Sequence, residues 1–257
     1  MWKTKLTKIY DILLFLLFVG LFAYCMLHPE LYCKTDKETG ALTLRPFLLA
    51  AEILVFLAGM VLLFFRSRIT LLLAKFARPL SIAVMVLTPC IAFAFTYVIT
   101  HSIPKNYLPR NYRNLAHSPE IIFYNVLAAA MILLVFLIIT NSIRISCNLL
   151  IWISIIFCVA NFYVTRFRDI PILASDFYSL RTAAAVAGDY SYKPNYICLF
   201  AVQAGLVYLF FFRCLGKTRL FSAKRRLVFA GISCIIIAIW GKIFVFSDYL
   251  ESRDIHL

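Results

Sequence analysis

The residues with the most evident chemistry lie in a short charged segment between two apolar runs, residues 166–190. Three arginines there, Arg166, Arg168 and Arg181, carry planar guanidinium groups that match the paired oxygens of a phosphate. Together with Tyr163, they are candidates for binding a lipid headgroup at a membrane surface. Nearby polar residues could instead hold these arginines in a structural network: Asn161, Asp169, Ser175 and Asp176. Lipid contact and a structural network are compatible, and both hypotheses stay open.

The order of residues in this segment predicts a helix, a break and a second helix. Polar residues recur every three or four positions from Asn161 to Asp169, so they share one face if the helix continues that far. Pro171 ends the helix, because the residue before a proline disfavours helical geometry. Ser175 is a good N-cap for a new helix that runs to about Ala187. We expect this short amphipathic helix to lie in the outer membrane interface.

The composition of the whole chain excludes an ordinary soluble domain. Of its 257 residues, 63% are hydrophobic and only 15% are charged, and the mean hydropathy is +0.89. Soluble domains are about half apolar, with roughly a quarter of their residues charged. The predicted fold class is therefore an all-α, polytopic transmembrane helical bundle with about seven spans of about 20 residues each. The predicted spans are 10–28, 46–65, 80–100, 120–140, 148–165, 195–213 and 227–246.

The distribution of charge predicts the orientation and argues against nucleic acid as a partner. The net charge is +14. More than half of the 26 lysines and arginines fall in the loops that are cytoplasmic if the N-terminus is cytoplasmic, where Asp11 is the sole acidic residue. The other loops carry both signs of charge, as the positive-inside rule requires. We therefore expect a plasma-membrane protein with a cytoplasmic N-terminus, an extracellular C-terminus and contacts to anionic phospholipid.

Two polar residues inside predicted spans stand out. Glu52 lies in the second span, where a carboxylate is costly and marks either a functional site or a hydrogen-bonded packing residue. Gln203, in the sixth span, suits an interhelical hydrogen bond. Between the second and third spans, residues 69–76 are either a short amphipathic helix or the beginning of the third span. Asp11 receives no predicted role.

Metal or cofactor chemistry has no sequence signal in this chain. Most of the eight cysteines lie in or beside apolar runs, and neither C-x-x-C nor a histidine pair with ligand spacing occurs. No P-loop, H-E-x-x-H or G-x-S-x-G motif is present either. We expect no metal site, no cofactor and no catalytic residue in this chain.

The segment from Asn161 to Tyr190 resembles the membrane domain of the lipoteichoic-acid synthase-like proteins, phosphoglycerol transferases of the sulfatase superfamily. The likeness covers about 30 residues and is carried by four phrases: Asn161-x-Tyr163, Arg166-Phe167-Arg168-Asp169-x-Pro171-Ile172, Ser175-Asp176-x-x-Ser179-Leu180-x-Thr182-Ala183 and Val186-Ala187-x-x-Tyr190. Asp169 departs from the family pattern, which has glycine there. Elsewhere the chain agrees with the family in hydropathy and orientation alone.

The resemblance implies a transmembrane domain over residues 1–246 and a short extracellular tail over residues 247–257. In the family, a large extracellular catalytic domain comes next, with a divalent metal and a threonine nucleophile; this chain ends before such a domain. The expected function is therefore to anchor, and to present lipid to, an extracellular catalytic domain or subunit. The alternative is a transporter or lipid-linked-saccharide flippase in which Glu52 contacts the substrate or coupling ion. A third possibility is a scaffold whose arginines all pair with aspartates.

Overall fold

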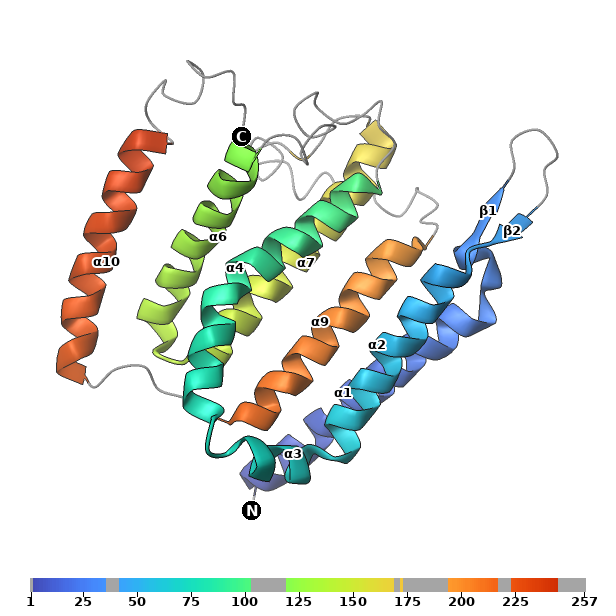
Figure 1. Cartoon of the computed structure of the whole chain (residues 1–257), viewed down its shortest axis with the longest axis horizontal. Helices are drawn as coiled ribbons and strands as arrows, with labels where there is room; N and C mark the ends of the chain where they lie inside the picture. Colours follow the sequence, from blue (N-terminus) through green and yellow to red (C-terminus); the bar gives the residue numbers. More distant parts are fainter. Residues whose placement is uncertain are drawn as a thin grey trace. The chain divides into compact units, whose positions relative to one another are not determined.

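A computed structural model describes residues 2–35, 42–102, 119–168, 172, 194–216 and 223–244, and the fold is given for these residues. They form long helices and one small β-hairpin (Figure 1). The predicted all-α membrane fold is confirmed. The predicted interfacial helix, and most of the segment 166–190, lie outside the described residues.

Six helices are long and apolar enough to cross a membrane, and they match the first six predicted spans. They are α1 (Trp2–Leu27), α2 (Pro46–Phe64), α4 (Ala77–His101), α6 (Pro119–Thr140), α7 (Ile143–Arg168) and α9 (Tyr196–Leu215). The seventh predicted span falls in α10 (Ala223–Phe244), whose apolar part, Val228–Lys242, is shorter than the other six. The chain is a multi-pass helical membrane protein.

The helices group into two compact units along the chain. Unit 1 comprises Met1–Leu72 and Ala184–Cys214, and unit 2 comprises Leu73–Ala183 and Leu215–Leu257. Each unit has its own packing and is described by itself. The predicted boundary between a helical domain and an extracellular tail at residue 247 lies outside the described residues and stays a prediction.

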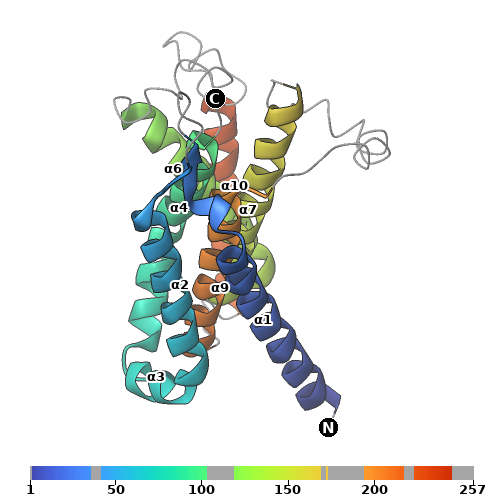
Figure 2. The same cartoon turned by 90° about the vertical axis from the view of Figure 1, so that its right-hand side faces the viewer.

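Unit 1 contains α1, α2 and α9, which lie beside one another (Figures 1 and 2). Between α1 and α2, the chain forms a 3-10 helix, η1 (Pro29–Tyr32), and an antiparallel hairpin of β1 (Cys33–Thr35) and β2 (Leu42–Leu44). After α2 comes the short helix α3 (Arg66–Leu73), and α4 begins at Ala77. The residues after α2 therefore form a separate short helix, which resolves the alternative left open by the sequence.

Aromatic side chains fill the middle of unit 1. Phe18 of α1 stacks on Phe56 of α2 at 5.5 Å between ring centroids, and it meets Phe210 of α9 edge-on at 5.3 Å. Phe22 stacks on the same Phe56 at 3.8 Å. Phe18 and Phe210 are fully or almost fully buried. We call Phe18, Phe22, Phe56 and Phe210 the aromatic layer, and it fixes the depth at which the three helices meet.

Unit 2 contains α4, α6, α7 and α10. Helix α4 packs against both α6 and α7, which also pack against each other, and α10 contacts α6. The turn between α6 and α7 is tight because Asn141 adopts a left-handed backbone conformation (φ 47°), which asparagine tolerates better than most residues. Arg226 of α10 donates hydrogen bonds to the carbonyls of Ile138 and Ile139 at 2.7 to 3.0 Å. These bonds satisfy carbonyl groups at the end of α6 that have no partner within the helix.

Helix α4 remains continuous through Pro89, although proline removes a backbone donor and disfavours a helix interior. Side-chain hydroxyls bond back to the carbonyl four residues earlier near this position. Ser81 Oγ donates to the Ala77 carbonyl at 2.6 Å, and Thr88 Oγ1 donates to the Val84 carbonyl at 2.7 Å. The Thr88 bond lies in the turn that precedes Pro89, and membrane helices tolerate proline when nearby groups satisfy the backbone.

Gly59 of α2 tests the packing of the aromatic layer. A Cβ atom at this position would lie 2.2 Å from Cζ of the buried Phe18 ring. Gly59→Ala should therefore displace that ring and destabilise the protein by about 1–3 kcal/mol. Thermal unfolding of the purified protein in lipid nanodiscs measures the effect.

Gly20→Ala in α1 is the matched control, because nothing lies within 4 Å of its added methyl group. It should leave the melting temperature unchanged or slightly raised, since alanine favours helix. Equal melting temperatures for the two variants would show that α2 does not pack against Phe18 as described.

Candidate functional site

Glu52 is the central residue of the candidate site in unit 1. Its side chain is completely buried, and neither carboxylate oxygen has a hydrogen-bond partner among the described residues. Phe56 and Gly59, one and two helical turns further along α2, both contact Phe18 of α1. Residues four and seven apart share one helix face, so Glu52 points toward α1 and the interior of unit 1.

Gln203 of α9 lies at a similar depth. Helices α2 and α9 run in the same direction: Tyr196 Oη donates to the Leu48 carbonyl at 2.8 Å near their beginning, and Cys214 Sγ lies 3.8 Å from the Leu62 carbonyl near their end. These two contacts place Gln203 beside the stretch of α2 that contains Glu52. The Gln203 side chain is also completely buried, and neither its amide oxygen nor its nitrogen has a partner among the described residues.

Three further side chains lie next to Glu52, between it and the hairpin. Cys25 of α1, Tyr32 of η1 and Tyr196 of α9 form one buried cluster, with the two tyrosine rings 5.1 Å apart. All three are close enough to Glu52 to interact with it electrostatically. Burial, and then the acidic groups of Cys25 and Glu52, raise the pKa of Tyr32 above its usual range. Tyr32 therefore remains a neutral hydroxyl.

We call Glu52, Gln203, Cys25, Tyr32 and Tyr196 the polar layer. Buried polar groups in proteins are nearly always hydrogen-bonded, because leaving one without a partner costs free energy. An acid and an amide without partners at one depth are therefore the most unusual feature of the described structure. The sequence predicted both residues as intramembrane polar groups, but only the helix packing brings them to one level.

The hairpin end of unit 1, beyond the polar layer, carries exposed charge. His28 Nδ1 lies 2.7 Å from Glu30 Oε1, and both side chains are solvent-exposed. Hydrogen bonds from its own backbone N–H and from His28 lower the pKa of Glu30. Glu30 is therefore an anion at neutral pH. Arg45 is also exposed at this end, at the start of α2.

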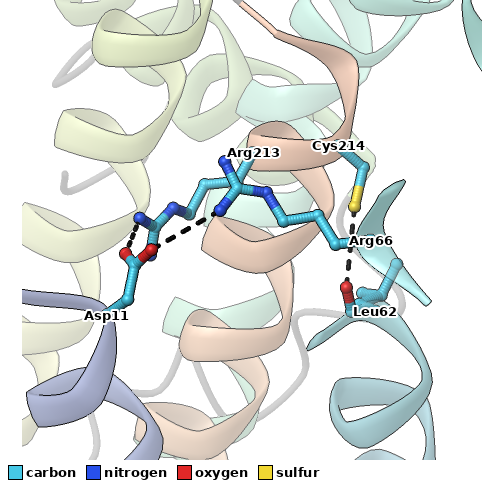
Figure 3. A network of polar contacts seen from close by, with 5 residues as sticks. All are labelled: Asp11, Leu62, Arg66, Arg213 and Cys214. Carbon is cyan, nitrogen blue, oxygen red and sulfur yellow. Dashed lines mark hydrogen bonds and ion pairs between the residues drawn. The ribbon is translucent and has the colours of Figure 1, made fainter. Parts of the chain in front are cut away.

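The opposite end of unit 1 holds an ion cluster (Figure 3). Asp11 of α1 binds two arginines: its Oδ1 accepts a hydrogen bond from Arg213 of α9, and its Oδ2 lies 3.6 Å from Arg66 of α3. The Arg213 side chain is only 9% exposed, and its guanidinium carbon lies 5.3 Å from the centroid of the Tyr10 ring. Asp11, which received no role from the sequence, thus joins three helices.

The structure describes part of the arginine segment in unit 2. Asn161 Oδ1 accepts a hydrogen bond from the backbone N–H of Ile172 at 2.8 Å. Arg166 is exposed, and its guanidinium carbon lies 5.7 Å from the centroid of the Phe162 ring. The Tyr163 ring packs edge-on against the same Phe162. The Arg168 side chain and the residues Asp169, Ser175, Asp176 and Arg181 lie outside the described part of the chain, so their predicted roles stay predictions.

All eight cysteines are free thiols, and no three His, Cys, Asp or Glu side chains of the described residues gather in a metal-binding cluster. No protein-family model, curated protein or solved structure matches this chain. The resemblance of residues 161–190 to lipoteichoic-acid synthase-like proteins therefore stays a prediction from the sequence.

Asp11→Asn tests the ion cluster. This change leaves the buried Arg213 guanidinium without an anion, which should destabilise the protein by about 2 kcal/mol, less than for a fully buried pair because Asp11 keeps contact with solvent. Arg66→Gln should cost less than about 1 kcal/mol, since that pair is longer and exposed. Chemical or thermal unfolding in detergent measures both effects.

The double variant Asp11→Asn with Arg213→Gln completes the test. Once the arginine charge is gone, the loss of Asp11 should matter less, so the double variant should lose less stability than the two single variants added together. Strict additivity would mean that the two side chains are not coupled.

Proposed function

We propose that this protein is a membrane module that binds an anionic lipid through Arg166 and its neighbours and presents it to an extracellular phosphoglycerol transferase. The six membrane-length helices make it an anchor. The sequence resemblance of residues 161–190 supports the transferase family, with a catalytic domain or subunit that supplies the divalent metal and the threonine nucleophile. The chain itself has no catalytic role in this proposal.

The observation that carries this proposal is the environment of Arg166. It lies in the last turn of α7, is exposed, and makes no ion pair within the described residues. Its position over Phe162 restricts the guanidinium through a cation–π contact. An exposed arginine at the end of a membrane helix lies at the level of lipid phosphates, and its planar fork matches two phosphate oxygens.

Asn161 supports the same proposal from the neighbouring turn. Its bond to the Ile172 backbone ties the chain after α7 back against this helix. The bond holds the Ile172 backbone against α7 at Asn161, about two turns before Arg168. A backbone position that is already held loses less conformational entropy when a headgroup binds nearby.

Removing the arginines should weaken lipid contact. Arg166→Ala combined with Arg168→Ala should reduce photocrosslinking to a phosphatidylglycerol analogue several-fold, because the phosphate loses its charged partners. Arg225→Ala is the control, since Arg225 is exposed in the first turn of α10, at the opposite, predicted cytoplasmic, membrane surface. Unchanged crosslinking in the first variant would leave only the anchoring role.

We expect phosphoglycerol transfer to be carried out by the extracellular catalytic domain or subunit and not by residues 1–257. The chain in lipid nanodiscs with labelled phosphatidylglycerol should release no labelled diacylglycerol above the rate in empty nanodiscs. Appreciable turnover would contradict the absence of a catalytic role.

A second candidate function is transport or flipping of a lipid-linked saccharide, and the polar layer favours it. Substrate and coupling-ion sites of transporters lie inside the bundle, where charged residues are otherwise too costly. Glu52→Gln should abolish translocation of a fluorescent lipid-linked saccharide in proteoliposomes under this alternative, and it should leave lipid crosslinking near Arg166 unchanged. Absence of translocation by the wild-type protein would exclude the alternative.

A further inference from the structure

We propose that the polar layer of unit 1 is a binding site for one monovalent cation, a proton or an alkali metal ion, with Glu52 as its anionic ligand. This site lies in a different unit from the lipid contact proposed for Arg166 and does not depend on it. Three features of the polar layer support this site: Glu52 is buried, it has no hydrogen-bond partner among the described residues, and no described cation lies beside it.

Charge balance favours a cation in the polar layer. Glu52 is the only carboxylate among the buried residues of the described structure. An ionised carboxylate without a partner in an apolar interior is strongly unfavourable. Among the described residues, the ionisable groups that interact with Glu52 are Cys25, Tyr32 and Tyr196, and none of them carries a positive charge in any protonation state. One positive charge would neutralise this site, whereas a divalent ion would leave an uncompensated charge.

The arginines of unit 1 whose side chains the structure describes do not supply that charge. Arg213 and Arg66 bind Asp11 at the far end of the same helices. The aromatic layer lies between this ion cluster and Glu52. Phe18 comes seven residues after Asp11 in α1, and Phe56 comes one turn after Glu52 in α2, on the side of Arg66. Arg45, at the hairpin end, is exposed to solvent.

The ligand chemistry of the polar layer suits a hard cation. Gln203 lies at the depth of Glu52 and offers a carbonyl oxygen to a metal ion, or an amide hydrogen to the carboxylate, and neither group has another partner among the described residues. Tyr32 adds a neutral hydroxyl oxygen, because its raised pKa keeps the proton on the phenol. Carboxylate, amide and hydroxyl oxygens are hard ligands that suit a proton or an alkali ion and disfavour soft metals.

The hairpin end is the end of unit 1 nearer to the polar layer, because Tyr32 and Tyr196 of that layer lie beside the hairpin. Tyr32 is the last residue of η1, the element that connects α1 to the hairpin. It also belongs to the buried cluster with Cys25 and Tyr196. Glu30 lies two residues away, exposed and anionic. A surface anion raises the local cation concentration. The hairpin end is therefore the side from which a cation would enter.

Reaction with dicyclohexylcarbodiimide tests the proposal, because this hydrophobic reagent modifies protonated carboxyl groups in apolar surroundings. The full chain in nanodiscs is treated at a series of pH values in choline chloride, and modification of Glu52 is quantified by peptide mass spectrometry. A site that exchanges protons should show a midpoint, above which labelling falls by about tenfold per pH unit.

Replacement of choline by Na⁺ or K⁺ at constant ionic strength separates the two occupants. Protection of Glu52 by one of these ions at fixed pH identifies an alkali metal site. Labelling that depends on pH alone identifies a proton site. Either result supports the proposal. The proposal would be overturned if Glu52 did not react at any pH between about 5 and 9. It would also be overturned if the extent of Glu52 modification changed with neither pH nor the added ion.

Variants assign the effect to the polar layer. Gln203→Leu should shift the pH profile or abolish protection by the ion, since it removes the second ligand. Glu30→Gln should leave the midpoint unchanged, because Glu30 is outside the layer. Thermal unfolding confirms that each variant is folded before its profile is compared with that of the wild type.

Discussion

The constraint on which this structure depends is that a polar group in an apolar membrane must find a partner inside the protein. Unit 1 contains two responses to it. At one end, the nearly buried charge of Arg213 is balanced by Asp11, and the ion cluster joins α1, α3 and α9. In the polar layer, Glu52 and Gln203 are completely buried and lack partners among the described residues. The Asp11–Arg213 pair stabilises unit 1. Glu52 and Gln203, which have no such partner, are free to bind a cation.

The aromatic layer makes this contrast possible, because Phe18, Phe56 and Phe210 separate the ion cluster from the polar layer. Without that separation, Arg213 could neutralise Glu52 and the unit would hold no uncompensated carboxylate. Unit 2 presents its polar groups differently. There, Arg166 lies exposed in the last turn of α7, and Asn161 accepts a hydrogen bond from the Ile172 backbone. The two units thus offer separate chemistries, a surface suited to phosphate and an interior suited to a cation.

Much of this fold could be predicted from the sequence, because lipid imposes long apolar runs that are visible without neighbours in space. The first six predicted spans match the six membrane-length helices of the described chain. The role of Asp11 was missed, since its partner Arg213 is 202 residues away and no local pattern joins them. The hairpin was missed as well, because strands of three residues are too short to show alternation. The common depth of Glu52 and Gln203 depends on the packing of α2 with α9, which periodicity within one helix does not encode.

The central claim is that the polar layer lies toward the exterior end of unit 1 and that the ion cluster lies at the cytoplasmic end. Cysteine accessibility in intact cells tests it most directly, in a background where the other native cysteines are replaced by serine. Cys33 of the hairpin should react with a membrane-impermeant maleimide added outside. A Ser67→Cys variant without Cys33 should react only after permeabilisation, because Ser67 lies in α3 beside the ion cluster. External labelling of the Ser67→Cys variant, with Cys33 protected, would contradict the account.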